Sequence, residues 1–290
     1  FARKRPLLED EIANGEFDVV NATTGRSNTM IVYITSMLSD LQTKDIQPKV
    51  FMFDQVFSEE MLAEEIYIRL AQTEVMRARE GGAASFVFVG SQGSGKTHSM
   101  ADIEERIAYD LFESARGPRP GFVAVQYLEL SGNRIVDLLG PSNNLVRIVN
   151  EAKSYQLKGS TIKSASSPRD LLAIMSEARR RLNNTSANQW QQDPPGYVLC
   201  HISVDLQWTK GTLILLDCPA CEMTRSRDGS SMFNGLMARI KAKGEGRSKE
   251  SLFQGENNIT KIMHDVLENP KGRISLLAAI SPAASHTEQT

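Results

Sequence analysis

The sequence predicts an α/β protein folded as a single domain, residues 1–290. Three observations support this class. Short apolar runs of strand length alternate along the chain with stretches whose apolar residues recur at the helical spacing. The densest run, at residues 85–89, is typical of a strand buried on both faces. Apolar residues make up 41% of the 290 positions and charged residues 23%, so wholesale disorder is excluded.

Charge and composition limit which binding partners and which cellular compartment we expect. The formal net charge is −2, so a polyanion would have to be met by a local patch, and we expect no nucleic-acid partner. No apolar run approaches the ~18 residues needed to span a bilayer, and the charged start lacks the apolar stretch of a signal peptide. Three cysteines do not form a disulfide framework, which favours a reducing, cytoplasmic location.

The elements of the first half follow from the same patterns. No element is predicted for the polar, weakly periodic residues 11–48. A short strand is expected at 50–53. A helix is expected at 58–80, ended by Gly81 and Gly82. The apolar strand at 85–89 then leads through a glycine-rich turn into a helix around 103–112.

The second half continues the alternation of strands and helices. Strands are expected at 122–130, 135–139, 146–149, 154–157, 198–208, 212–216 and 274–280. Helices are expected at 171–182, with Pro168 near the first turn, and at 259–267. Residues 183–197 are expected to be irregular, and the polar, charged residues 222–256 to be partly mobile.

The clearest motif follows the buried strand. It consists of Gly90, Ser91, Gln92, Gly93, Ser94, Gly95, Lys96 and Thr97, and it fits G-x-x-x-x-G-K-[ST] without a mismatch. Glycines let successive backbone N–H groups curl around an anion, and the following helix directs its positive end at phosphates. Lys96 then supplies a point charge and the Thr97 hydroxyl a ligand for Mg²⁺. The alternative is a glycine-rich turn with a chance lysine.

A phosphate loop of this kind requires a carboxylate at the end of a neighbouring strand. Asp217 follows the apolar residues 213–216 and meets this requirement, so we expect it on the Mg²⁺ side of the site. The alternative is an aspartate that only caps the next helix.

Together these segments resemble the kinesin motor domain. The resemblance rests on FVGSQGSGKTHSM at 88–100, VQYLEL at 125–130 with Asn133 and VDLL at 136–139, RKRPL at 3–7, FDQVF at 53–57, and ITK at 259–261 followed by AISPA at 279–283. Their order and spacing match over essentially the whole chain. The sequence is therefore identified as a divergent member of that family.

The resemblance implies a three-layer fold with a mixed central sheet between helices. It also implies ATP or ADP as ligand, Mg²⁺ as cofactor, microtubules as partner and a cytoskeletal location. By position, Arg3, Arg5 and Pro6 would flank the adenine and His98 would stack on it; a solvated helix-start residue is the alternative for His98. The chain begins with Phe1 and stops before the family's last helix and neck, so we expect a piece cut at both ends, with any coiled-coil dimerisation outside it.

The switch segments depart from the family pattern. Kinesins carry N-x-x-S-S-R-S-H in the first switch, whereas residues 190–197 read WQQDPPGY. The second switch, D-x-x-G-x-E in kinesins, keeps Asp217 and Glu222 but has Ala220 in place of glycine and adds Pro219. We expect Asp217 and Glu222 to be the catalytic residues. Glu222 lacks its expected arginine partner unless Arg180 or Arg181 replaces it.

The region expected to bind microtubules also departs from the family pattern. Asn258 stands where the family has a lysine, and the helix after the second switch is expected to be shortened. A basic patch remains possible, formed by Lys241, Lys243, Arg247, Lys249 and Lys261. A solvated charged loop is the alternative.

Two readings of function follow. The first is an ATP-hydrolysing microtubule motor. The second is a non-motile or catalytically impaired nucleotide-binding scaffold, because the first-switch segment is absent. Other chemistry is disfavoured: Cys218 and Cys221 lie in the second switch rather than in a redox motif, and Cys200 and His201 are adjacent on a strand and point to opposite faces. Arg179, Arg180 and Arg181 are expected at a solvated helix end.

Overall fold

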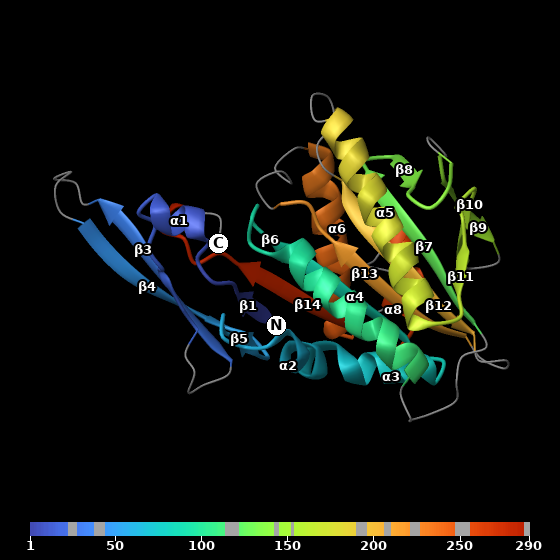
Figure 1. The fold of residues 1–290 in the computed structure, drawn as a ribbon, viewed down its shortest axis with the longest axis horizontal. Helices are drawn as coiled ribbons and strands as arrows, with labels where there is room; N and C mark the ends of the chain where they lie inside the picture. Colours follow the sequence, from blue (N-terminus) through green and yellow to red (C-terminus); the bar gives the residue numbers. More distant parts are fainter. Residues whose placement is uncertain are drawn as a thin grey trace.

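The structure, a computed structural model, describes residues 1–22, 28–37, 44–113, 122–141, 145–151, 154–189, 196–205, 210–220, 227–246 and 256–286. Its centre is a mixed sheet in the order β11-β7-β12-β13-β6-β14-β1-β5, with β8 paired to β7 (Figure 1). The strands are β11 (Lys163–Ala165), β7 (Phe122–Ser131), β12 (Tyr197–Asp205), β13 (Lys210–Asp217), β6 (Ala83–Gly90), β14 (Arg273–Ile280), β1 (Ala2–Lys4), β5 (Val56–Phe57) and β8 (Arg134–Asp137).

Five neighbouring strands of this sheet run parallel. β13, β6, β14, β1 and β5 pair in parallel, whereas β11, β7, β12 and β13 pair antiparallel. The carboxyl ends of parallel strands lie at one edge of a sheet, which is where ligands bind in open α/β folds. The loops after β1, β6, β13 and β14 therefore meet at one edge.

Helices cover both faces of the sheet. One face carries α2 (Ala63–Tyr67), the π-helical turn η1 (Ile68–Gln72), α3 (Thr73–Arg79), α4 (Lys96–Glu113) and α5 (Pro168–Gln189) (Figure 1). The other carries α6 (Arg227–Gly244), α7 (Asn258–Ile262) and α8 (His264–Glu268). The predicted three-layer architecture with a mixed sheet is confirmed. No helix among the described residues is long and apolar enough to cross a bilayer.

Alternating side chains of the central strands form two cores. Phe86 and Phe88 of β6 pack under α4, whereas Val87 between them packs toward α8. Helix α4 presents Ile103, Ile107 and Leu111 to the first core, at intervals of four residues. The helix that opens at the phosphate loop is therefore fixed against the strand that precedes it.

A second, smaller sheet was not predicted as a whole, although the short strand expected at 50–53 overlaps its last strand. It consists of β2 (Val20–Ala22), β3 (Thr29–Met37) and β4 (Lys44–Met52), all antiparallel, and it projects beside β1 (Figure 1). Only one of its faces is buried, with Val20, Met30 and Val32 packed against Ala2 and Ile280. The expectation of no element over 11–48 is therefore wrong. The short helix α1 (Glu9–Ala13) precedes this sheet, and β9 (Arg147–Glu151) and β10 (Ser154–Lys158) form a separate hairpin.

Three further predictions of elements are corrected. Helix α5 continues through 183–189, which was expected to be irregular. Residues 227–244, expected to be partly mobile, form the 18-residue helix α6, in which Met232 and Leu236 face the core one turn apart. The helix expected at 259–267 is broken at Met263 into α7 and α8. The chain's last described element is the 3₁₀ turn η4 (Ala284–His286).

Candidate functional site

The candidate site lies where four parallel strands end. β6 ends at Gly90 and opens the phosphate loop, and β13 ends at Asp217. β1 leads into Arg5, and β14 leads into Ser281. The register pairs Asp217 with Phe88, so the carboxylate stands beside the start of the loop. The sheet thus brings together segments from both ends and the middle of the chain.

The phosphate loop adopts a backbone that requires glycine. Gly90, Gly93 and Gly95 have φ values of 148°, 71° and 96°. A Cβ atom at Gly90 would lie 2.3 Å from the carbonyl oxygen of Ala279 on β14. The loop is closed by Ser94, whose Oγ donates to the Ser91 carbonyl over 2.8 Å. Gly90 is therefore needed for packing against β14, and all three glycines for the curl of the loop.

Lys96 opens α4 and turns back into the loop. Its Nζ donates to the carbonyl oxygens of Gly90 at 3.0 Å and Ser91 at 2.6 Å, and the residue is 9% exposed. The buried Ser91 Oγ has no hydrogen-bond partner within the described part of the chain. A buried polar atom left unpaired is costly, so this loop has donors available for a ligand.

Thr97 and Asp217 meet across the loop. Thr97 Oγ1 donates to Asp217 Oδ2 over 2.6 Å. The other carboxylate oxygen, Oδ1, is buried and has no partner among the described residues. Burial raises the pKa of Asp217, although the hydrogen bond from Thr97 and the charges of Lys96 and Arg179 oppose this. A hydroxyl and a carboxylate with a vacant lone pair are the oxygen donors that Mg²⁺ accepts, so these residues fit the cation.

Arg5 joins the phosphate loop to the end of β14 and to α1. Its Nε donates to the Gly93 carbonyl over 2.7 Å, and Nη2 donates to Ser281 Oγ over 2.8 Å. Glu11 accepts both guanidinium ends, at 2.7 and 2.5 Å, and Nη1 also donates to the Pro6 carbonyl. Arg5 is thus buried and hydrogen-bonded to the phosphate loop, and its expected place beside an adenine stays a prediction.

Arg3 and His98, also expected near the base, meet at the start of α4: Arg3 extends from β1, and His98 is part of the helix. Arg3 donates to Ser99 Oγ at 2.9 Å and pairs with Asp102 at 3.3 Å. His98 Nδ1 lies 3.1 Å from the same Asp102 carboxylate, and its side chain is 72% exposed. Asp102 therefore holds Arg3 and His98 side by side, with His98 open to solvent.

A cavity of about 320 Å³ adjoins the phosphate loop. Its lining comes from the loop, the ends of β7 and β12, α5 and the residues after β13. The lining includes Lys96, Thr97, Tyr127, Arg179, Asp217 and Ala220. Pro219 and Ala220, the two departures in the second switch, are both part of this wall. Glu222 and residues 190–195 of the first switch lie outside the described residues.

Arg179 was missed by the sequence analysis. The three arginines were expected at a solvated helix end, but α5 continues beyond them and Arg179 points inward to pair with the buried Glu104. Arg180 is exposed, and Arg181 pairs with Glu177. The signal was present: Arg179 stands four residues after the buried Met175, where the apolar stripe of α5 would otherwise continue.

The cysteines and the histidine of β12 do not form a site. Cys200 and Cys218 are buried free thiols, and burial raises the pKa of Cys200 to about 12. His201 faces the opposite side of β12, where its Nδ1 lies 3.0 Å from Gln126 Oε1. Within the described ranges, no cluster of three potential ligands is arranged to hold a metal ion, and Cys221 lies outside them.

The predicted basic patch is only partly present as surface charge. Lys243 of α6 donates to the carbonyl oxygens of Leu267 and Asn269, at 3.1 and 2.6 Å, and so serves the end of α8. Lys241 is exposed and Lys261 is half-buried. Arg247 and Lys249 lie outside the described residues.

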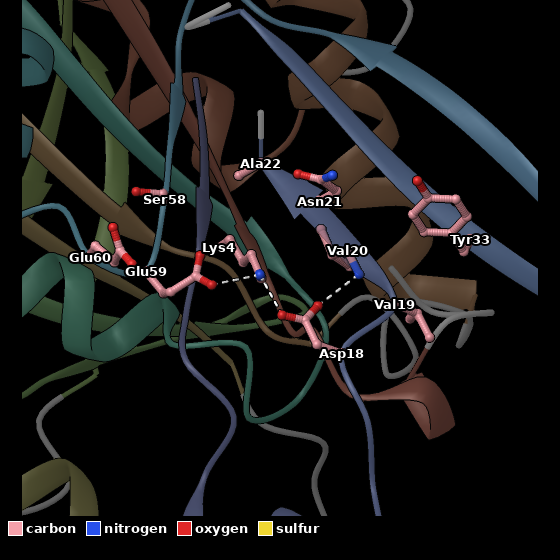
Figure 2. Close-up of a pocket in the computed structure, with 10 residues that line it drawn as sticks. All are labelled: Lys4, Asp18, Val19, Val20, Asn21, Ala22, Tyr33, Ser58, Glu59 and Glu60. Atoms are coloured by element: carbon pink, nitrogen blue, oxygen red, sulfur yellow. Dashed lines mark hydrogen bonds and ion pairs between the residues drawn. The ribbon is translucent and has the colours of Figure 1, made fainter. Parts of the chain in front are cut away.

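A second cavity, of about 400 Å³, lies between β1 and the small sheet (Figure 2). Lys4 crosses it, and its Nζ contacts Asp18 at 2.5 Å and Glu59 at 2.8 Å. Burial alone would lower the pKa of Lys4, but the hydrogen bonds to both carboxylates raise it. Lys4 and the two carboxylates therefore pair with one another, and these ion pairs link β1 to the segments before β2 and after β5.

The chain is similar in sequence to known proteins. The sequence model described as the kinesin motor domain matches residues 3–193. Kinesin-like protein KIN-7B of Arabidopsis thaliana is 24% identical over 85% of this chain and 29% of its own length. Diatom spindle kinesin-1 of Cylindrotheca fusiformis is 24% identical over 99% and 48%, and mouse kinesin-like protein KIF24 is 24% identical over 99% and 22%. The chain thus spans about half or less of these relatives.

A solved structure shares the fold. The structure of a fast kinesin superposes with a TM-score of 0.77, at 20% identity, over 100% of this chain and 86% of that one. At this identity the likeness extends to the fold alone.

Proposed function

Because the chain belongs to the kinesin motor domain family, we propose that it binds ATP with Mg²⁺ at the phosphate loop and couples ATP hydrolysis to microtubule binding and movement. This function places it in the cytoplasm, on the microtubule cytoskeleton. ADP is the product and occupies the same site.

The observation that carries the proposal is the Thr97–Asp217 pair beside the phosphate loop. The pair is formed at 2.6 Å and leaves Asp217 Oδ1 buried without a partner in the described part of the chain. A loop that only turned the chain would have no need of a carboxylate held in this way, because burying a charge is costly. The cost is offset when a cation is bound.

The chain's own residues divide the work of binding. Lys96, released from the two loop carbonyls, pairs with phosphate oxygens, and the loop N–H groups and the start of α4 surround the rest. Thr97 would hold Mg²⁺ directly and Asp217 would hold it through water. The bound cation would neutralise charge on the phosphate oxygens.

The free energies involved separate nucleotide binding from ATP hydrolysis. Micromolar affinity corresponds to about −8.2 kcal/mol, and losing one charge-assisted contact costs roughly 1.5–3 kcal/mol. Binding through an intact phosphate loop therefore survives the altered switches. Hydrolysis depends on groups that position the attacking water, so it is more sensitive.

The second candidate is a non-motile, nucleotide-binding scaffold of the same family. It is favoured by Pro219 and Ala220, which form part of the cavity wall where kinesins use a glycine. Proline and alanine restrict the backbone that must rearrange on hydrolysis.

The basic patch supplies the proposed contact with microtubules. Of its described residues, Lys241 on α6 is exposed, and we propose that this lysine contacts an acidic tubulin surface.

The test is steady-state phosphate release with ATP and Mg²⁺, with and without microtubules. Lys96→Ala is the site variant, and Arg169→Ala, an exposed change at the start of α5, is the matched control. We expect turnover that microtubules stimulate, that Lys96→Ala abolishes and that Arg169→Ala leaves unchanged. Equilibrium binding of ATP and ADP is measured in the same samples.

The outcomes separate the candidates. Nucleotide binding without phosphate release under either condition would support the scaffold and exclude the motor. Absence of nucleotide binding by the parent protein would overturn both.

A further inference from the structure

A buried cluster supports the cavity from the side of α5. Arg179 pairs through Nη2 with Glu104 of α4, and Tyr127 of β7 donates to the other oxygen of the same carboxylate at 3.1 Å. Glu104 and Tyr127 are each 1% exposed. Two partners therefore fix the carboxylate, and the carboxylate fixes the guanidinium. An arginine held in this way is pre-organised, because little side-chain freedom remains to be lost when it binds.

The guanidinium also faces the cavity. Arg179 is 28% exposed at its side chain and lines the same cavity as Thr97 and Asp217. Of the described residues that line this cavity, Lys96 and Arg179 alone are cationic. Lys96 belongs to the phosphate loop itself, so Arg179 is the additional positive charge, and α5 contributes it.

We propose that Arg179 contacts the terminal phosphate of bound ATP and so distinguishes ATP from ADP. This inference rests on the proposed nucleotide binding. Glu104 takes one N–H group of the guanidinium, and the planar fork has further N–H groups with which to meet phosphate oxygens.

A purely structural ion pair is the competing explanation. Under that explanation Arg179 only neutralises Glu104, and its loss weakens all ligands together by loosening the cavity. The two explanations differ in one measurable quantity, the ratio of ADP and ATP-analogue dissociation constants. Burial lowers the pKa of Arg179 while Asp217 is among the charges that oppose this, consistent with a guanidinium close to the Mg²⁺-side carboxylate.

The experiment titrates the protein, with Mg²⁺ present, with ADP and with a non-hydrolysable imido analogue of ATP. We expect Arg179→Ala to weaken the analogue about tenfold to a hundredfold, the loss of one charge-assisted contact, and ADP less than threefold. Arg179→Lys keeps the charge and should fall between. Arg169→Ala, an exposed arginine on the same helix, should change neither constant.

A further variant deals with the carboxylate that Arg179→Ala leaves unpaired. Glu104→Gln combined with Arg179→Ala removes both charges, and it should show the same loss for the analogue if the phosphate contact is the cause. Equal weakening of ADP and the analogue in both variants would overturn the inference while leaving the proposed function intact. Failure of the parent protein to bind either nucleotide would instead overturn the proposed function.

Discussion

Arg5 shows how one buried side chain outside the nucleotide motif stabilises the phosphate loop. It hydrogen-bonds the phosphate loop at Gly93, the end of β14 at Ser281 and the helix α1 at Glu11. Glu11 in turn accepts a hydrogen bond from the backbone N–H of Leu8 at 2.8 Å. The loop therefore depends on a carboxylate that lies outside the nucleotide motif.

This arrangement predicts a specific dependence of stability on pH. The hydrogen bonds from Arg5 lower the pKa of Glu11 from 4.5 to about 2. Because the folded-state pKa is below the unfolded one, the stabilisation is present above pH 4.5 and is lost as pH falls toward 2. We expect Glu11→Gln to lower the free energy of unfolding at pH 7, and to differ less from the parent at pH 3. Urea denaturation at both pH values measures this.

Glu9→Gln, on the exposed side of the same helix, is the control. It should follow the parent at both pH values. A Glu11→Gln difference that stays constant between pH 7 and pH 3 would contradict the assignment.

At the scale of elements, α6 and α8 are joined by a lysine rather than by apolar packing alone. Lys243 in the last turn of α6 reaches the carbonyl oxygens at the end of α8. Helix ends carry unpaired carbonyls and partial negative charge, so a cation there is stabilising. A residue that the sequence assigned to a surface patch thus has a packing role.

We expect Lys243→Ala to lower the free energy of unfolding by about 1–2 kcal/mol, because the half-buried carbonyl of Leu267 and the exposed carbonyl of Asn269 lose their donor. Lys241→Ala, exposed on the same helix, should change stability by less than about 0.5 kcal/mol. Thermal or urea unfolding of the two variants checks the difference. Equal effects would mean that the Lys243 contacts contribute nothing.

The elements also show what the sequence could predict. The strand β6 and helix α5 were predicted because their apolar residues are dense or regularly spaced. The small sheet was not, because Val50, Met52 and Ile46 of β4 are exposed while only alternate residues of β3 are buried. In α6 the spacing of Met232 and Leu236 was present, but the polar and glycine residues around them obscured it.

The candidate site was predictable to a similar degree. The phosphate loop and Asp217 follow from motif spacing and strand position, since a strand and its following residue stay together in space. Arg179 and Arg5 act through contacts 75 and 88 positions away in the chain, with Glu104 and Gly93. Spacing along one element contains no information about such partners.

At the scale of the molecule, the small sheet packs on β1 and β14 of the main sheet through a small core distinct from the two larger ones. Met30 of β3 is 1% exposed and packs in a small cluster with Ala2, Val20 and Ile280, apart from the two cores of the main sheet. Proteins open locally in cooperative units that follow such divisions. The small sheet should therefore unfold more readily than the main one.

We expect Met30→Ala to destabilise the small sheet by about 2–5 kcal/mol, the usual cost of truncating a buried methionine. Hydrogen exchange should accelerate in β2 and β3 and remain slow in β6 and β13. Leu215→Ala, within the main core, should accelerate exchange throughout. Equal acceleration in both sheets by Met30→Ala would show that they open as one unit.

The order of strands in the main sheet has a consequence for synthesis. β6 carries the phosphate loop, yet its neighbours β13 and β14 come from the last third of the chain, and Thr97 waits for Asp217, 120 positions later. At translation rates of about 5–20 residues per second, the ribosome exposes this apolar strand with both edges open for seconds. Such a nascent segment is what chaperones protect. The phosphate loop is therefore synthesised well before the carboxylate that completes the nucleotide site.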